Sequence, residues 1–246
     1  MTKIIAEIGL NHMGSPRILD KMIKDLVRNK VYGVTVQILK DNYYNQTRPF
    51  RKKIDMKYYQ KISKFLKKNQ IKFGIALVDA KTIKDFKDIN IDFWKILSMQ
   101  FFNKKLIEET LKTNKEVYLS SGIVSDNDIQ KMSKKYKKIN FIHTSFSSDI
   151  KKTNLSAISK LKNRIKNKVS FGLHSEIHDV VIGSIVLRAD TVFFYVKYGN
   201  KIKYPDHEHA INLENLNFKI KIWRKIMLSL GSGIKKREKL PNWVFE

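Results

Sequence analysis

Polar residues stand in or at the ends of short apolar runs along this 246-residue chain, where they could carry chemistry. Glu7 interrupts one such run, and a carboxylate buried there costs several kcal/mol unless something pairs with it. Lys95 lies inside another run and needs an anion for the same reason. Carboxylates, imidazoles and hydroxyls gathered at strand ends are suited to acid–base catalysis and anion binding. The candidates are Glu7, Gln37, Lys95, Ser98, Ser120, His143, His174 and, after the last run, Asp206.

The run that contains Glu7 opens the clearest structural unit of the chain. The stretch 4–8 is short and continuously apolar, which is typical of a parallel strand covered on both faces. Asn11 and His12 follow in a polar loop. Ser15 is a helix-capping residue, and Pro16 suits the first helical position. The sequence therefore predicts one unit of an α/β fold, with its polar residues at the carboxyl end of the strand.

The same alternation of strand and helix continues to the end of the chain. The apolar patterns predict strands over 4–8, 33–39, 71–77, 93–97, 117–119, 139–143, 169–173 and 191–196. They predict helices after Pro16 and over 58–66, 82–87, 104–113, 154–165, 176–187 and 213–230, with one more that opens at a capping box of Ser125 and Asp128. Eight such units favour a closed (β/α)8 barrel, and a doubly wound open sheet is the alternative. Because polar residues recur at the ends of several strands, the barrel is preferred.

Length and composition limit the classes of function. The chain suits a single barrel domain over 1–246 and leaves no room for a second domain of ordinary size. It has no cysteine, which excludes disulfides and thiolate chemistry. No signal peptide or membrane span is recognisable, so we expect a cytoplasmic protein. The net charge of +26 is spread over all the predicted helices, which favours a lysine-rich solvated surface over a nucleic-acid site.

A family resemblance adds to this reading. The run Ala-Glu-Ile-Gly-Leu-Asn-His-Met-Gly-Ser, residues 6–15, resembles the opening strand and loop of the sialic acid synthase (N-acetylneuraminate synthase) family. Phe-Trp-Lys-Ile-Leu-Ser, 93–98, is similar to the family's Tyr-Lys-Ile-Gly-Ser, and Leu-Ser-Ser-Gly, 119–122, to its Leu-Ser-Thr-Gly. Tyr-Pro-Asp-His, 204–207, resembles Gly-Pro-Asp-His. The resemblance implies a barrel that condenses phosphoenolpyruvate with an N-acylated amino sugar, with a divalent metal such as manganese.

The resemblance also implies roles for the matched residues. Glu7, Gln37 and Asp206 would be catalytic. Substrate binding would fall to Asn11, His12, Lys95, Ser98, Ser120 and His143, of which Lys95, Ser98 and Ser120 would hold the phosphate. The antifreeze-like domain that usually follows the family's barrel is not present within 1–246, and the oligomeric state is left open.

Departures from the family concentrate at the metal site. The family's metal is held by two histidines, and strand eight here has Phe193 and Tyr195 where Glu and His are usual. The family's other metal-binding histidine, after strand seven, has only an ambiguous counterpart here in His174. His178, His207 and His209 are further imidazoles. Phenylalanine offers no ligand atom and a neutral phenol is a poor one. The sequence therefore predicts that no divalent metal binds tightly.

Two functions remain open on this evidence. One is a synthase that makes a nonulosonic, sialic-acid-like sugar acid. The alternative is a catalytically degenerate barrel that acts as a binding or regulatory partner in surface-polysaccharide biosynthesis. The second hypothesis remains open because the family's metal ligands are missing and a fold alone does not give a function.

Overall fold

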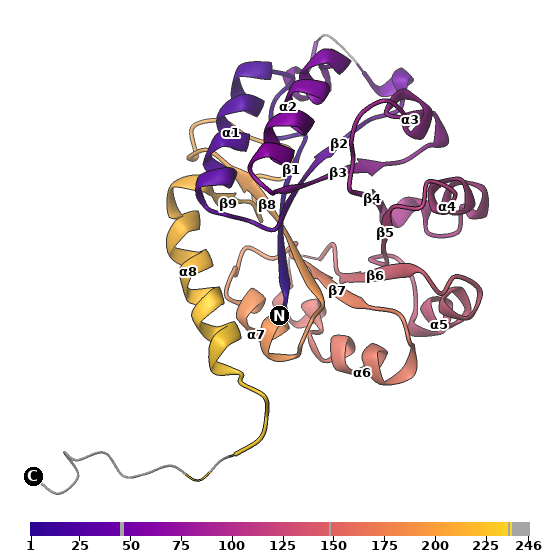
Figure 1. Cartoon of the computed structure of the whole chain (residues 1–246), viewed down its shortest axis with the longest axis vertical. Coiled ribbons are helices and arrows are strands. Elements are labelled where there is room, and N and C mark those ends of the chain that lie inside the picture. Colours follow the sequence, from indigo (N-terminus) through magenta and orange to yellow (C-terminus); the bar gives the residue numbers. More distant parts are fainter. Residues whose placement is uncertain (45–46, 148, 236, 238–246) are drawn as a thin grey trace, which may run out of the picture.

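The strands form a closed parallel barrel, because the first strand pairs with the eighth as well as with the second (Figure 1). The computed structural model describes residues 1–44, 47–147, 149–235 and 237. Within them the barrel strands are β1 (Lys3–Gly9), β2 (Gly33–Gln37), β3 (Lys72–Leu77), β4 (Phe93–Ile96), β5 (Glu116–Ser120), β6 (Ile139–Thr144), β7 (Val169–Gly172) and β8 (Thr191–Lys197). The predicted (β/α)8 barrel is confirmed, and the open-sheet alternative is wrong.

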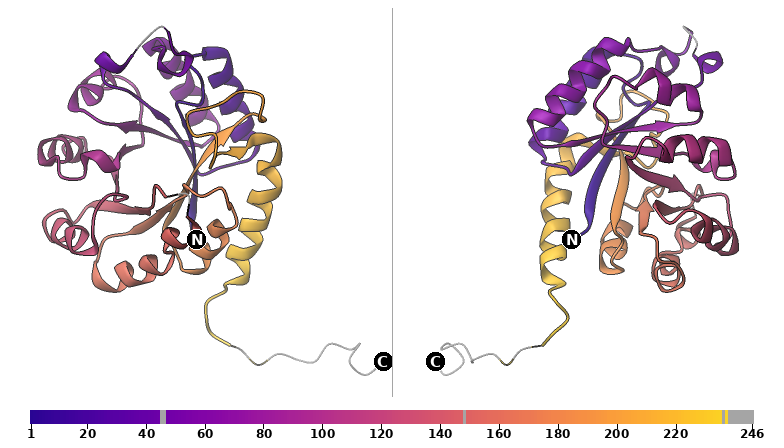
Figure 2. Two further views of the ribbon diagram at one scale, coloured as in Figure 1. Left: turned by 180° about the vertical axis from the view of Figure 1, so that it is seen from behind. Right: turned by 45° about the vertical axis from the view of Figure 1, so that its right-hand side comes forward.

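Helices cover the outside of the barrel between successive strands. They are α1 (Pro16–Arg28), α2 (Met56–Lys68), α3 (Ala80–Asp85), α4 (Lys104–Leu111), α5 (Asp126–Lys135), α6 (Ser156–Arg164), α7 (Val180–Val186) and α8 (Leu213–Ser229). The last of them, α8, contacts α7 on one side and α1 on the other (Figure 2). The helix ring is therefore closed like the strands within it. In the described part of the chain, no helix is both long and apolar enough to cross a membrane.

Local sequence signals explain where several helices begin. The Ser15 hydroxyl accepts a hydrogen bond from the Ile18 amide at 3.3 Å, with Pro16 in the first helical position. The predicted capping box of Ser125 and Asp128 is present in full at the start of α5. The helix predicted over 176–187 is wrong at its start, since α7 begins only at Val180. There the Ser175 hydroxyl accepts from the Ile177 amide at 3.1 Å, and this local turn competes with the helix.

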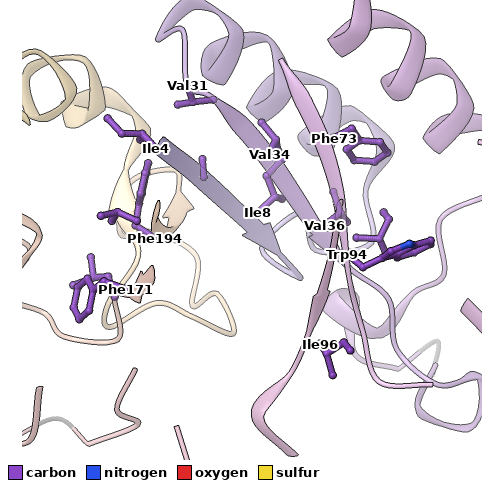
Figure 3. Close-up of a cluster of buried hydrophobic side chains, with 14 of the residues drawn as sticks. Ile4, Ile8, Val31, Val34, Val36, Phe73, Trp94, Ile96, Phe171 and Phe194 are labelled. Atoms are coloured by element: carbon purple, nitrogen blue, oxygen red, sulfur yellow. The ribbon is translucent and has the colours of Figure 1, made fainter. Parts of the chain in front are cut away.

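Alternate strand residues face the helices and the barrel interior. The outward side chains form the larger core, part of which Figure 3 shows with Ile8, Val34 and Trp94. The interior holds a separate buried cluster of five residues, Ile5, Phe93, Tyr118, Ile142 and Phe193. Gly74 makes room for it, since a Cβ there would lie 2.2 Å from the Phe93 ring. The barrel centre is thus a packed core and no open channel.

Polar residues close the amino end of the barrel, away from the loops that carry the predicted site. The Lys3 ammonium lies 3.2 Å from the Glu116 carboxylate, which also accepts a hydrogen bond from the Asn140 amide at 3.0 Å.

A short strand that was not predicted, β9 (Ile211–Asn212), pairs with the carboxyl end of β8 and joins the loop after β8 to the sheet. The carboxyl end of the barrel is consequently the face on which a site can form.

Candidate functional site

A buried ion pair lies at the centre of the candidate site. The Lys95 ammonium, from β4, contacts the Glu7 carboxylate, from β1, inside the barrel. Their side chains are only 4% and 3% exposed. The prediction that Glu7 is buried and partnered by a cation or by several hydrogen-bond donors is confirmed, and the partner is a cation. The same contact places Lys95 on the inside of the barrel, near the carboxyl ends of the strands.

Aromatic rings form one wall around the Lys95 ammonium. Its nitrogen lies 5.4 Å from the centre of the Phe193 ring and 5.6 Å from that of Tyr195. Both residues come from β8, where alternate positions face inward. Ring faces attract a cation, so this wall stabilises the ammonium as well as excluding water.

Two imidazoles lie in contact with each other and with the Tyr195 ring. The rings of His174 and His209 lie 4.6 Å apart between centroids, and both meet the Tyr195 ring edge-on at 5.5 and 5.1 Å. Phe146, from the loop after β6, covers His174 at 4.9 Å. Burial, and after it the charges of His209 and Lys95, lower the pKa of His174 to about 3. His174 is therefore neutral at physiological pH.

Asp206 reaches this group from the loop after β8. Its carboxylate oxygen Oδ1 lies 3.7 Å from the Nε2 atom of His209. Its backbone amide donates to the Oδ1 atom of Asn11 at 3.2 Å, while the Nδ2 atom of Asn11 donates to the Val196 carbonyl at 2.9 Å. Asn11 is fully buried, so its amide joins the loops after β1 and β8. The side chain predicted to bind substrate thus positions Asp206 instead of lining the mouth.

His12 is also enclosed within the loop after β1. Its Nδ1 atom accepts a hydrogen bond from the Gly14 amide at 2.9 Å, which fixes a neutral ring with its proton on Nε2. Within the described residues, the buried Nε2 atom has no hydrogen-bond partner. Burial lowers the pKa of His12 to about 4. The side chain is 2% exposed, so a ligand could reach it only through movement of this loop.

Two serines predicted to bind phosphate lie near the ion pair on neighbouring strands. The Ser98 hydroxyl, just after β4, accepts a hydrogen bond from the Gly122 amide at 3.0 Å and so joins the loops after β4 and β5. Ser120 ends β5 in the same alternating set as Tyr118, which belongs to the interior cluster. Both serines are buried, and both lie at the carboxyl end of the barrel with Lys95.

Gln37 lies at the carboxyl end of β2, beside an open cleft. The cleft has a volume of about 350 Å³ and is lined by residues of the loops after β1 to β4, among them Leu10, Gln37, Lys40, Tyr43, Arg51 and Gln100. Its wall is mainly apolar, with two basic residues. The cleft is a recess at the carboxyl end of the barrel, of a size that suits a small ligand.

His143 does not join this group. Its neighbour Ile142 belongs to the interior cluster, so the alternation along β6 turns His143 outward toward the helices. There its Nε2 atom lies 2.9 Å from the Thr153 carbonyl. Its predicted place in the mouth is therefore corrected to the outer layer. Tyr195, which the sequence placed at the position of a family metal ligand, and His209 do lie together in the mouth. The alternation along β8 puts Tyr195 on the same face as Phe193.

The side chains at the mouth do not suit a divalent metal. No three His, Asp or Glu side chains converge on a common point anywhere in residues 1–44, 47–147, 149–235 and 237. The rings of His174 and His209 are tilted by 35° to each other, and their contact is between ring faces and edges. Within the described residues these two imidazoles and the Asp206 carboxylate therefore do not make a ligand set for a divalent ion.

Comparison with known proteins gives consistent matches over almost the whole chain. The model of the NeuB family matches residues 17–235. The N,N'-diacetyllegionaminic acid synthase of Campylobacter jejuni is 23% identical over 267 residues, covering 97% of this chain and 80% of that protein. The pseudaminic acid synthase of Helicobacter pylori is 21% identical, and the match covers 93% of this chain and 75% of that protein. The N-acetylneuraminic acid synthetase of Leptospira borgpetersenii, solved with citrate, has the same fold, with a TM-score of 0.87, 21% identity and coverage of 96% and 87%.

Proposed function

The chain belongs to the NeuB family, and on that premise we propose that it condenses phosphoenolpyruvate with an N-acylated amino sugar to give a nonulosonic, sialic-acid-like sugar acid. Relatives named as legionaminic and pseudaminic acid synthases support this class of product. The observation that carries the proposal is the buried pair of Lys95 and Glu7 facing the mouth of the barrel. We place this carbohydrate biosynthesis in the cytoplasm.

In this proposal phosphoenolpyruvate binds beside Lys95. An ammonium has three donors, and in the structure Lys95 uses one of them on Glu7. The other two are available to a phosphate or carboxylate. Ser98 and Ser120, at the ends of the adjacent strands β4 and β5, supply hydroxyl donors to the same anion. The excess of positive charge on the whole chain would speed the arrival of an anionic substrate.

The reaction joins carbon 3 of phosphoenolpyruvate to the aldehyde carbon of the sugar. A water molecule adds at carbon 2, and phosphate leaves as the new keto group forms. Glu7 is placed to accept a proton from that water, because its carboxylate lies inside the mouth beside the anion site. Gln37 at the end of β2 and Asp206 in the loop after β8, on either side of β1, orient the hydroxyl groups of the sugar. No step of this scheme is assigned to a metal.

The alternative, a catalytically degenerate barrel that binds a partner or a metabolite, is favoured by one observation. Lys95 is already neutralised by Glu7, and two aromatic rings lie beside its ammonium. A site that binds an anion without catalysing a reaction would need no groups beyond this lysine and its surroundings. The two functions differ in turnover, so a product assay separates them.

The test is incubation of the purified chain with phosphoenolpyruvate and a set of N-acylated amino sugars. Phosphate release and product mass are followed together, with chelator or manganese added. We expect phosphate release coupled to one new sugar acid. Lys95→Met should abolish it, and Lys72→Met, which removes an exposed lysine paired with Asp92 on the opposite face, should leave it unchanged. Binding of phosphoenolpyruvate without any turnover would instead support the degenerate barrel.

A further inference from the structure

The Tyr195 hydroxyl is a polar group in the mouth that the proposed roles leave unused. The side chain is 5% exposed and belongs to the inward-facing set of β8. No hydrogen bond to this hydroxyl is found among the residues that the structure describes. The hydroxyl is also not one of the fully buried atoms that lack a partner, so it is open to the mouth, where a ligand can accept its hydrogen bond.

Tyr195 is held firmly in place. Its ring packs edge-on against both His174 and His209. On the other side it fills the space over Gly9, where a Cβ atom would come within 2.8 Å of the ring. Gly9 has a φ of +54°, a conformation that favours glycine, and it ends β1 two residues after Glu7. Tyr195 is also the direct partner of Glu7 in the pairing of β1 with β8.

We propose that Tyr195 and Lys95 together polarise the aldehyde oxygen of the second substrate, in a site that works without a divalent metal. This inference rests on the proposed function. The Tyr195 phenol and the Lys95 ammonium polarise the aldehyde in place of a metal ion, for which the described residues provide no set of ligands. Preorganised donors of this kind, aimed at an oxygen that develops negative charge, are a main source of catalysis in closed sites.

The protonation states suit this role. Burial, followed by the negative charges of Glu7 and Asp206, raises the pKa of Tyr195 well above its ordinary value. The phenol is therefore a hydrogen-bond donor throughout the physiological range. Lys95, in contact with Glu7 and beside two ring faces, supplies the positive charge on the same side. Neutral His174 adds no competing charge.

The step balances without any further reactant. As carbon 3 of phosphoenolpyruvate bonds to the aldehyde carbon, the electron pair of the carbonyl moves to its oxygen, which Tyr195 protonates. The water that adds at carbon 2 loses two protons. One returns to the Tyr195 oxygen through Glu7, and the other leaves with phosphate. The bond between carbon 2 and the bridging oxygen of the phosphate breaks, and its electron pair leaves with phosphate. The water oxygen stays on carbon 2 as the keto group.

The experiment compares Tyr195→Phe with wild type in the coupled phosphate and product assay. Phenylalanine keeps the ring packing and removes only the donor. Loss of one such donor lowers kcat by about 10²–10³-fold in other enzymes. We expect a fall of that order in kcat, with the Kd for phosphoenolpyruvate unchanged by calorimetry. Wild-type turnover should be the same with chelator as with manganese.

Tyr118→Phe is the matched control. Tyr118 faces the barrel interior below the mouth, where its hydroxyl lies 3.4 Å from the Thr191 hydroxyl. Its replacement should leave kcat close to wild type. Fluorotyrosine incorporated at position 195 provides a variant that keeps both the ring and the donor. Since fluorine lowers the phenol pKa, the alkaline limb of the kcat profile should move to lower pH.

The outcomes separate this inference from the proposed function. Wild-type turnover that survives intact in Tyr195→Phe would overturn the role of Tyr195 and leave the synthase proposal standing. Turnover that needs manganese would overturn the metal-free site in the same way. Absence of turnover in wild type with every sugar would overturn both. If Tyr195→Phe fails to fold, an unchanged pH profile in the fluorotyrosine protein would still contradict the proposal.

Discussion

Glu7 and Lys95, 88 residues apart in the chain, form a buried ion pair across the interior of the barrel between β1 and β4. Two charges taken out of water gain little net stability from each other, but either one left alone is costly. A hydrophobic pair of similar volume would often serve the fold as well. The pair is therefore better explained by what it can do at the mouth than by what it adds to stability.

Single substitutions of this pair should be more damaging than the double substitution. Glu7→Gln leaves the Lys95 ammonium buried without its carboxylate, and such losses cost about 3–5 kcal/mol. Replacing both, as Glu7→Gln with Lys95→Met, removes the uncompensated charge. We expect urea denaturation to show the double variant recovering most of the lost free energy of unfolding. Phosphoenolpyruvate binding should be lost in Lys95→Met and in the double variant, and kept in Glu7→Gln.

The control for this cycle is the exposed pair of Lys72 and Asp92 at the other end of the barrel. Its single variants should change the free energy of unfolding by less than about 1 kcal/mol, as is usual for surface pairs. If the double variant in the mouth bound phosphoenolpyruvate like wild type, the pair would be structural only.

Chelator should not change the stability of the purified protein. A ligand stabilises a protein only if it binds the native state, and the mouth offers no converging set of metal ligands in the described part of the chain. Melting temperatures with and without chelator should coincide, and metal analysis should give far less than one equivalent. Stoichiometric manganese or zinc that disappears in His174→Ala would show that a metal site had been rebuilt around His174, with His178, His207 or His209.

The free energy of unfolding should fall in acid partly through His12. Its pKa is lowered by burial from 6.5 to about 4, so the unfolded chain takes up a proton at a higher pH than the folded protein does. Its contribution is complete above the unfolded pKa and is lost as the pH drops from about 6.5 toward 4, by about 3 kcal/mol in total.

The measurement is urea denaturation of wild type and His12→Gln at several pH values. Glutamine keeps an acceptor for the Gly14 amide and does not titrate in this range. The stability of the variant should depend less on pH between 6.5 and 4. Parallel curves for the two proteins would contradict the burial of a neutral His12.

Gly74→Ala tests the packed interior. Its new Cβ would lie 2.2 Å from the Phe93 ring, a contact that real side chains do not tolerate. Overpacking of this kind costs about 1–3 kcal/mol. Adding Phe93→Leu should give the new methyl group room, so the double variant should be more stable than the sum of the single effects predicts. Strict additivity, measured by thermal unfolding, would place the ring elsewhere.

The barrel could be predicted from the sequence because its signals are local and repeated. Apolar runs, the cap at Ser15 and the capping box of Ser125 and Asp128 each depend on neighbours in the chain. The burial of Glu7 with a cation followed from the cost of an unpaired carboxylate. The sequence did not indicate that the partner is Lys95. An apolar pattern along the chain does not show which residues of distant strands face each other across a closed barrel.

The outward position of His143 depends on which alternate residues of β6 face inward, and that is set by the packing of Ile142 against other strands. The contact between His174 and His209 brings together two loops, and these residues are 35 positions apart in the chain. The start of α7 was predicted wrongly because the turn at Ser175 competes with a helix-like pattern. Contacts between loops of different strands are what the sequence alone could not show.

Titration calorimetry of the purified chain with phosphoenolpyruvate, with chelator and then with manganese, tests whether Lys95 binds this substrate without a metal. We expect one binding site per chain with the same Kd under both conditions, lost in Lys95→Met and kept in Tyr195→Phe. Binding that appears only with manganese, or that survives in Lys95→Met, would contradict this expectation.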